Sequence, residues 1–141
     1  MKHAKLDAIV DTSVKDHESA KAAIESHFFS SNPPDGVFAL KNFVTIYAYE
    51  VFQKLHINIP RKVALVGFDD FELAATLRPS ISVVRQPSED VGRIDAELLF
   101  DQLVNRCRGK LSHGDKAKPQ HIKLENQLVL RNSCGCNIGT H

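Results

Sequence analysis

The chain has 141 residues, of which 43% are hydrophobic and 25% charged, and its formal net charge is +1. This length and composition are typical of one globular domain with its own core and exclude wholesale disorder. The balanced charge argues against a nucleic-acid-binding face, and no apolar stretch approaches the roughly 20 residues that span a bilayer.

The N-terminal residues lack the apolar core of a secretory signal. The chain contains 3 cysteines, an odd number that fits a reducing compartment better than a disulfide scaffold. We therefore expect a cytoplasmic protein with no membrane attachment.

Short apolar runs alternate with amphipathic stretches along the chain. The pattern predicts strands over residues 6–11, 36–40, 63–66, 81–84 and 121–131, and helices over residues 16–30, 44–55 and 88–106. Ser88 is a candidate N-cap of the third helix, and residues 109–120 read as a polar loop. This order predicts an α/β fold of three αβα layers, with an open and mostly parallel sheet.

The stretch Val-Ala-Leu-Val-Gly-Phe-Asp-Asp-Phe at residues 63–71 is the most informative in the chain. Its continuous apolar run is typical of a strand that is buried on both faces of a parallel sheet. Ligands of such sheets bind at the carboxyl ends of the strands, where Gly67, Asp69 and Asp70 fall. A carboxylate there can accept hydrogen bonds from a polyhydroxylated ligand.

The same residues carry a resemblance to a known family. Residues 59–70, Ile-Pro-Arg-Lys-Val-Ala-Leu-Val-Gly-Phe-Asp-Asp, resemble the C-terminal half of LacI/GalR-type bacterial transcriptional regulators. The similarity continues through Leu-Arg-Pro-Ser-Ile-Ser-Val-Val-Arg-Gln-Pro and ends in Leu-Val-Leu-Arg-Asn-Ser-Cys-Gly. It covers roughly residues 33–135, in the family's order and spacing.

The resemblance implies a periplasmic-binding-protein-like fold of type I, with two lobes and an effector in the cleft between them. Residues 1–141 would then be a single partial effector-binding domain: the second lobe, a hinge-crossing helix at 88–106 and a final strand at 121–131. The DNA-binding headpiece and the first lobe would be absent. We expect another chain, or folding back onto the lobe, to cover the apolar face of that helix, which comprises Val91, Ile94, Leu98, Leu99 and Leu103.

The resemblance also implies effector-binding residues. Asp69 matches a ligand-binding carboxylate of the family, although it could instead cap a short helix or form a turn. Leu40 and Lys41 stand where most relatives carry Asn-Asp. Lys41 could select an acidic sugar or a phosphate, or pair with Asp69. Gln86 occupies a hinge position, where a hinge role competes with ligand contact.

Further positions have both a functional and a structural interpretation. Asp11 and Ser13 are cleft candidates at the end of the first predicted strand. Asn42 is a candidate N-cap of the second helix, and Asp70 is expected to bind neighbouring backbone. By resemblance, a homodimer interface would use residues of the second helix and the following loop: Tyr47, Val51, Leu73 and Leu77. Core packing explains Val51 equally well.

Other chemistry finds little support. The seven histidines show no metal-ligand spacing, and the single Cys-x-Cys pair at Cys134 and Cys136 is a poor zinc site. No nucleophile stands beside a base, and the acids do not follow the strands in the order of a phospho-receiver. We expect no cofactor, no metal and no enzyme activity.

The sequence thus favours a sensing region for a small-molecule effector, a sugar or sugar derivative, in a DNA-binding regulator. Operator DNA would be bound only through the absent headpiece. A periplasmic solute-binding protein of the same fold, or a stand-alone α/β binding module, are the alternatives.

Overall fold

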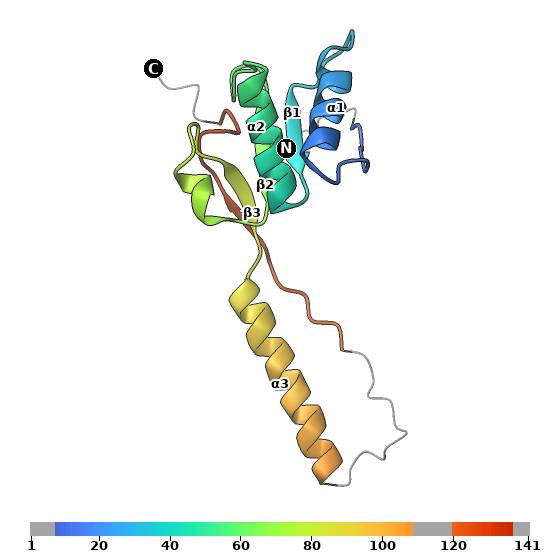
Figure 1. Cartoon of the computed structure of the whole chain (residues 1–141). Helices are drawn as coiled ribbons and strands as arrows, with labels where there is room; N and C mark the ends of the chain where they lie inside the picture. Colours follow the sequence, from blue (N-terminus) through green and yellow to red (C-terminus); the bar gives the residue numbers. More distant parts are fainter. Residues whose placement is uncertain (1–7, 109–119, 137–141) are drawn as a thin grey trace. The chain divides into compact units, whose positions relative to one another are not determined.

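A computed structural model describes residues 8–108 and 120–136 of the chain (Figure 1). The chain divides into two compact units. The sheet unit comprises the described residues up to Val84 and from Leu128 onward, and the α3 unit runs from Arg85 to Gln127.

One sheet has four strands in the order β1-β2-β3-β4: β1 (Gly36–Ala39), β2 (Ala64–Phe68), β3 (Ser82–Arg85) and β4 (Gln127–Val129). β2 pairs in parallel with both β1 and β3. The prediction of an α/β fold with an open, mostly parallel sheet is therefore confirmed.

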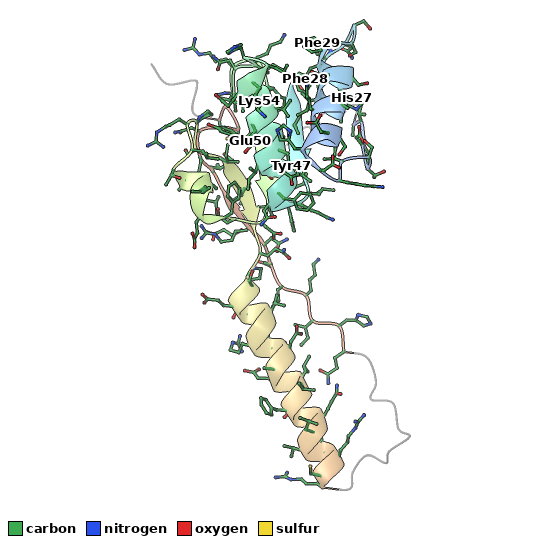
Figure 2. All side chains as sticks on the ribbon, in the orientation of Figure 1. His27, Phe28, Phe29, Tyr47, Glu50 and Lys54 are labelled. Atoms are coloured by element: carbon green, nitrogen blue, oxygen red, sulfur yellow. The ribbon has the colours of Figure 1, made fainter. Side chains whose placement is uncertain are left out.

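Helix α2 (Asn42–Lys54) packs on β1 and β2, and α1 (His17–Phe28) packs on α2. Apolar residues recur along α2 so that one face meets the sheet, and Val51 and Phe52 are its largest buried residues. Between α1 and α2, Phe28 and Phe52 meet edge to face with ring centroids 5.1 Å apart (Figure 2 labels Phe28). The largest fully buried hydrophobic side chains form the core between α2 and the sheet: Phe52, Leu65, Ile81, Val51, Val63 and Val83.

Gly67 permits the close approach of α2 to β2. A Cβ atom at this position would lie 2.7 Å from Thr45 Oγ1 and 2.9 Å from Thr45 Cγ2. Thr45 is fully buried, and its hydroxyl donates to the carbonyl of Lys41 one turn earlier at 3.0 Å. The glycine that interrupts the apolar run is therefore a packing requirement.

The end of the described chain closes the sheet unit. The backbone of Ser133 accepts a hydrogen bond from Leu65 N–H at 2.8 Å, and its hydroxyl donates to the Leu65 carbonyl. The same hydroxyl oxygen accepts from the N–H of Ser82 at 2.8 Å. Ser133 is fully buried, so one polar side chain satisfies backbone groups of both β2 and β3.

Two sequence predictions about elements are wrong, those of the first and the last strand. Residues 8–11 of the predicted first strand have no regular structure, while residues 6 and 7 lie outside the described ranges. Among the described residues of the predicted last strand, only Gln127–Val129 are extended in the sheet. The loop predicted at 109–120 lies almost entirely outside the described ranges.

The predicted caps also differ. Helix α3 (Ser88–Cys107) has Pro87 at its N-cap, so Ser88 is its first residue instead of its cap. Lys41 occupies the N-cap position of α2, and the Asn42 side chain accepts only from the next N–H, of Phe43, at 2.7 Å. Both helices therefore begin, at Pro87 and Lys41, without a side-chain hydrogen bond from the N-cap residue.

Helix α3 contains both apolar and charged residues but buries none of them in the described part of the chain. Five of its large apolar side chains are 41–64% exposed, namely Val91, Leu99, Phe100, Leu103 and Val104. The expectation that another chain covers this face, or that the face folds back onto the lobe, stays a prediction.

Candidate functional site

The carboxyl ends of the parallel strands meet at one edge of the sheet. Ala39 in β1 pairs with Gly67 in β2, and Gly67 pairs with Val83 in β3. Because the strands are parallel and in this register, Leu40 and Lys41 leave the sheet at the same edge as Asp69. We call this the carboxyl edge.

Asp69 has an uncommon backbone conformation at this edge. Its φ angle is 71°, in the left-handed region that non-glycine residues rarely adopt. Its N–H donates to the carbonyl of Val84 at 2.9 Å, which continues the β2–β3 ladder by one bond beyond the strand. Aspartate tolerates this region better than most residues, and such strained positions concentrate at ligand sites.

Asp70 is held by Arg131 from the end of the chain. The guanidinium donates to both carboxylate oxygens, Nη1 to Oδ1 at 3.0 Å and Nη2 to Oδ2 at 2.9 Å. Nη1 also donates to the carbonyl of Ile81 at 2.7 Å, and the two side chains are only 15% and 16% exposed. Asp70 Oδ1 accepts the N–H of Phe71 at 3.0 Å, as expected for a residue that binds its neighbouring backbone.

Lys41 and Leu40 are both exposed at the carboxyl edge. The Lys41 ammonium nitrogen lies 5.5 Å from the ring centroid of Phe43, a cation–π distance. Leu40 is 65% exposed, so its side chain is accessible to a ligand or to a second lobe.

Asp11 and Ser13 are joined to each other and to α1. Asp11 Oδ1 accepts both the hydroxyl (2.6 Å) and the N–H (2.8 Å) of Ser13, and Oδ2 lies 3.1 Å from His27 Nε2. The Ser13 hydroxyl and backbone, followed by His27, lower the pKa of Asp11 from 3.8 to about 2. These contacts give both residues a role in fastening the segment before α1.

Gln86 lies in the α3 unit, apart from the unit that contains Asp69. Its side chain is exposed, and its carbonyl accepts the N–H of Ser88 at 3.0 Å. That position, between β3 and α3, is consistent with a connecting segment.

The residues expected at a dimer interface have different environments. Val51 is 1% exposed, which favours the core interpretation of this residue, and Leu77 packs partly against the core. Leu73 is 59% exposed. Tyr47 is half-buried between the rings of Phe43 and His17, at centroid distances of 5.7 and 5.8 Å (Figure 2).

Sequence reasoning missed the polar network beneath the carboxyl edge. Ser82 is fully buried, and its hydroxyl oxygen accepts the N–H of Arg131 at 2.8 Å. A serine inside the apolar run Ile-Ser-Val-Val was the available signal, because a buried hydroxyl requires a partner. That partner is a segment about 50 residues away, which no local pattern identifies.

The described residues contain no group of three or more His, Cys, Asp or Glu side chains placed to hold a metal ion. In residues 8–108 and 120–136, no helix has the length and apolar character needed to cross a membrane.

Comparison with known proteins decides the family. The family model described as a periplasmic binding protein-like domain matches residues 1–134. The chain belongs to this family, as an effector-binding domain of the LacI type. It is 31% identical over 123 residues to the HTH-type transcriptional regulator KdgR of Bacillus subtilis, covering 85% of this chain and 33% of that protein.

Two solved structures are similar over most of the chain. One is the transcriptional regulator CelR in complex with cellobiose, with 31% identity, a TM-score of 0.65, and coverage of 83% of this chain and 33% of that one. The other is a LacI family regulator from Arthrobacter in complex with lactose, with 25% identity, a TM-score of 0.61, and coverage of 84% and 40%.

The chain thus spans about a third of the length of these curated relatives. The relatives are transcriptional regulators, and LacI-type regulators are not enzymes, in agreement with the prediction of a non-catalytic binding module.

Proposed function

We propose that the carboxyl edge forms one wall of the binding site for a sugar or sugar derivative in a LacI-type transcriptional regulator. The observation that carries the proposal is the position of Asp69, a carboxylate in a left-handed conformation directly after β2. Its neighbour Asp70 is fixed by two hydrogen bonds from Arg131, so the loop presents Asp69 from a rigid base. Such preorganisation reduces the entropy lost on binding.

Solved relatives support the ligand class. The structures of CelR and of the Arthrobacter regulator contain cellobiose and lactose, respectively. Charged carboxylates make strong hydrogen bonds to sugar hydroxyls. The ammonium of Lys41 at the same edge adds a positive charge, which favours a sugar that carries a carboxylate or phosphate.

The proposed effector acts in a larger regulator. Effector binding would favour one arrangement of two lobes, and that arrangement would change operator binding by a separate DNA-binding domain in a cytoplasmic homodimer. Exposed Leu73 and half-buried Tyr47 and Leu77 are the proposed dimer contacts on this lobe. The match to transcriptional regulators favours this role over a periplasmic transport receptor.

The experiment is a titration of the chain with a neutral disaccharide and with a hexuronic acid, followed by backbone amide NMR shifts. We expect shifts at residues 40–41 and 69–70, with weak affinity because one lobe supplies half of a cleft. Asp69→Asn should abolish them, whereas Asp35→Asn, at the opposite end of β1, should not. Lys41→Met should weaken the hexuronic acid selectively.

Shifts confined to other surfaces, or equal shifts in the Asp69→Asn protein, would remove the carboxyl edge as the effector site. If the neutral disaccharide gives the stronger response and Lys41→Met leaves that response unchanged, only the preference for an anionic sugar is rejected.

A further inference from the structure

The Cys134–Gly135–Cys136 turn lies outside the proposed effector site and brings two thiols to one point of the surface. Gly135 has a φ angle of 77°, a conformation that glycine adopts without steric penalty. The turn directs the N–H of Cys136 back to Cys134 Sγ, at 3.4 Å. Both cysteines are free thiols; Cys136 is exposed and Cys134 half-buried.

The surroundings make the two thiols chemically unequal. Burial raises the pKa of Cys134, but hydrogen bonds from the Ser82 side chain and from Cys136 outweigh it, so its pKa is lowered. The pKa of Cys136 is raised, chiefly by its hydrogen bond to the Cys134 side chain. The Cys134 thiol also donates to the carbonyl of Arg131 at 3.6 Å. Of the two thiols, Cys134 is thus the one that loses its proton more readily.

We propose that Cys134 and Cys136 form a reactive dithiol that a hydroperoxide oxidises to an intramolecular disulfide. The Cys134 thiolate attacks the peroxide oxygen, the O–O bond breaks, and sulfenic acid and hydroxide (or alkoxide) form. The Cys136 sulfur then attacks the sulfenic sulfur, the S–O bond breaks, and water leaves with the thiol proton. The two thiols lose two electrons in all, and the peroxide gains them.

The short chain between the two cysteines keeps them within reach of this bond. Disulfides join residues whose Cα atoms are about 4.4–6.8 Å apart. Two residues in sequence span at most about 7 Å when extended, and the left-handed turn at Gly135 shortens that span. Exposure of Cys136 gives solvent and oxidant access to the pair.

A chain with the third cysteine replaced isolates the pair. Cys107→Ser removes the exposed thiol of α3, which belongs to the other unit. The reduced Cys107→Ser protein is treated with hydrogen peroxide, alkylated with N-ethylmaleimide under denaturing conditions, and examined by intact and peptide mass spectrometry. We expect a monomer in which neither thiol can be alkylated and whose mass is lower by two hydrogens. Dithiothreitol should restore both thiols.

Single variants test the assigned order. With Cys136→Ser added, Cys134 should accumulate as sulfenic acid that dimedone traps. With Cys134→Ser added, Cys136 should oxidise at least about tenfold more slowly than Cys134 does, because an unstabilised thiol is mostly protonated.

One further measurement needs no additional variant, so it stays valid even if the Cys134→Ser protein folds poorly. The folded Cys107→Ser protein receives a brief pulse of light N-ethylmaleimide and then a denaturing chase with the heavy reagent. The pulse should label Cys134 and Cys136 unequally, and prior treatment with peroxide should block the labelling of both. Persistence of both thiols after peroxide, or disulfides only between chains, would overturn the proposal. The outcome does not depend on the effector, so it is independent of the proposed function.

Discussion

Arg131 holds Asp70 with a two-pronged contact, each guanidinium nitrogen donating to a different carboxylate oxygen at 2.9–3.0 Å. The two residues are separated by 61 positions in the sequence, and both side chains are largely buried. The pair therefore connects the tail to the loop that presents Asp69.

Removing one member of this pair should destabilise the sheet unit strongly. Arg131→Ala leaves the Asp70 carboxylate partly buried without its cation, and we expect a loss of about 2–4 kcal/mol in the free energy of unfolding. Arg131→Lys should recover only part of it, because an ammonium group cannot reproduce the planar two-pronged contact. Urea unfolding followed by circular dichroism measures both.

Arg93→Ala supplies the matched control. Arg93 also contacts two carboxylates, Asp90 and Glu97, but all three side chains are more than half exposed. Its loss should leave the free energy of unfolding close to that of the unchanged chain, because water screens an exposed ion pair. Equal effects of Arg131→Ala and Arg93→Ala would contradict the assigned role of the Asp70 contact.

A second prediction concerns the packing of α2 on β2. Gly67→Ala places a methyl group against the Thr45 side chain, with the added Cβ only 2.7 Å from Oγ1. This overlap should destabilise the protein by about 1–3 kcal/mol. Adding Thr45→Ala removes the two nearest atoms and should restore part of the loss. Thermal unfolding of the single and double variants measures how far the two changes in stability depend on each other. If the two changes simply add in the double variant, the steric explanation is refuted.

A third prediction uses the backbone of Asp69. Asp69→Gly and Asp69→Ala both remove the carboxylate, so they differ mainly in the cost of the 71° φ angle. The glycine variant should be more stable than the alanine variant by about 1 kcal/mol, because alanine is strained in the left-handed region. At Asp35, whose φ is not in this region, the same pair of substitutions should not favour glycine. Chemical denaturation compares the four proteins.

The fourth prediction is a pH dependence. Because the pKa of Asp11 falls from 3.8 to about 2 on folding, the ionised carboxylate stabilises the folded state above about pH 4. This contribution is lost as the pH falls from there towards 2. The side chain is 31% exposed, so we expect Asp11→Asn to cost only about 0.5–1 kcal/mol at pH 6.

Urea titrations of the native chain and Asp11→Asn between pH 2 and 6 check this dependence, with Asp35→Asn as the control. A stability difference for Asp11→Asn that is constant across this range would show that the carboxylate is not stabilised by folding.

Local patterns predicted the central strands and helices because those elements bury contiguous apolar faces. Residues 63–71 were recognised as a buried strand followed by acids, and the structure has β2 and Asp69 there. The same reasoning failed at residues 8–11, because a run of apolar residues does not specify whether a neighbouring strand is available to pair with it.

The site could be predicted only in part for the same reason. The end of the predicted strand indicates Asp69, and the family resemblance adds Leu40 and Lys41. The parallel register of β1 and β2 places all three at the same edge of the sheet. The contacts of Asp70 with Arg131 depend on tertiary structure across 61 positions and leave no local pattern. The pairing of Asp11 with His27 likewise joins residues 16 positions apart.

The position of Ser133 between β2 and β3 has a consequence for the order in which the protein forms during translation. Its hydroxyl bonds Leu65 and Ser82, which precede it by 68 and 51 residues. A nascent chain therefore leaves the N–H and carbonyl of Leu65 and the N–H of Ser82 without these partners until Ser133 has left the ribosome, and unpaired strand groups invite association with other chains. The interval between synthesis of β3 and synthesis of Ser133 is thus when this lobe is most vulnerable to misassembly.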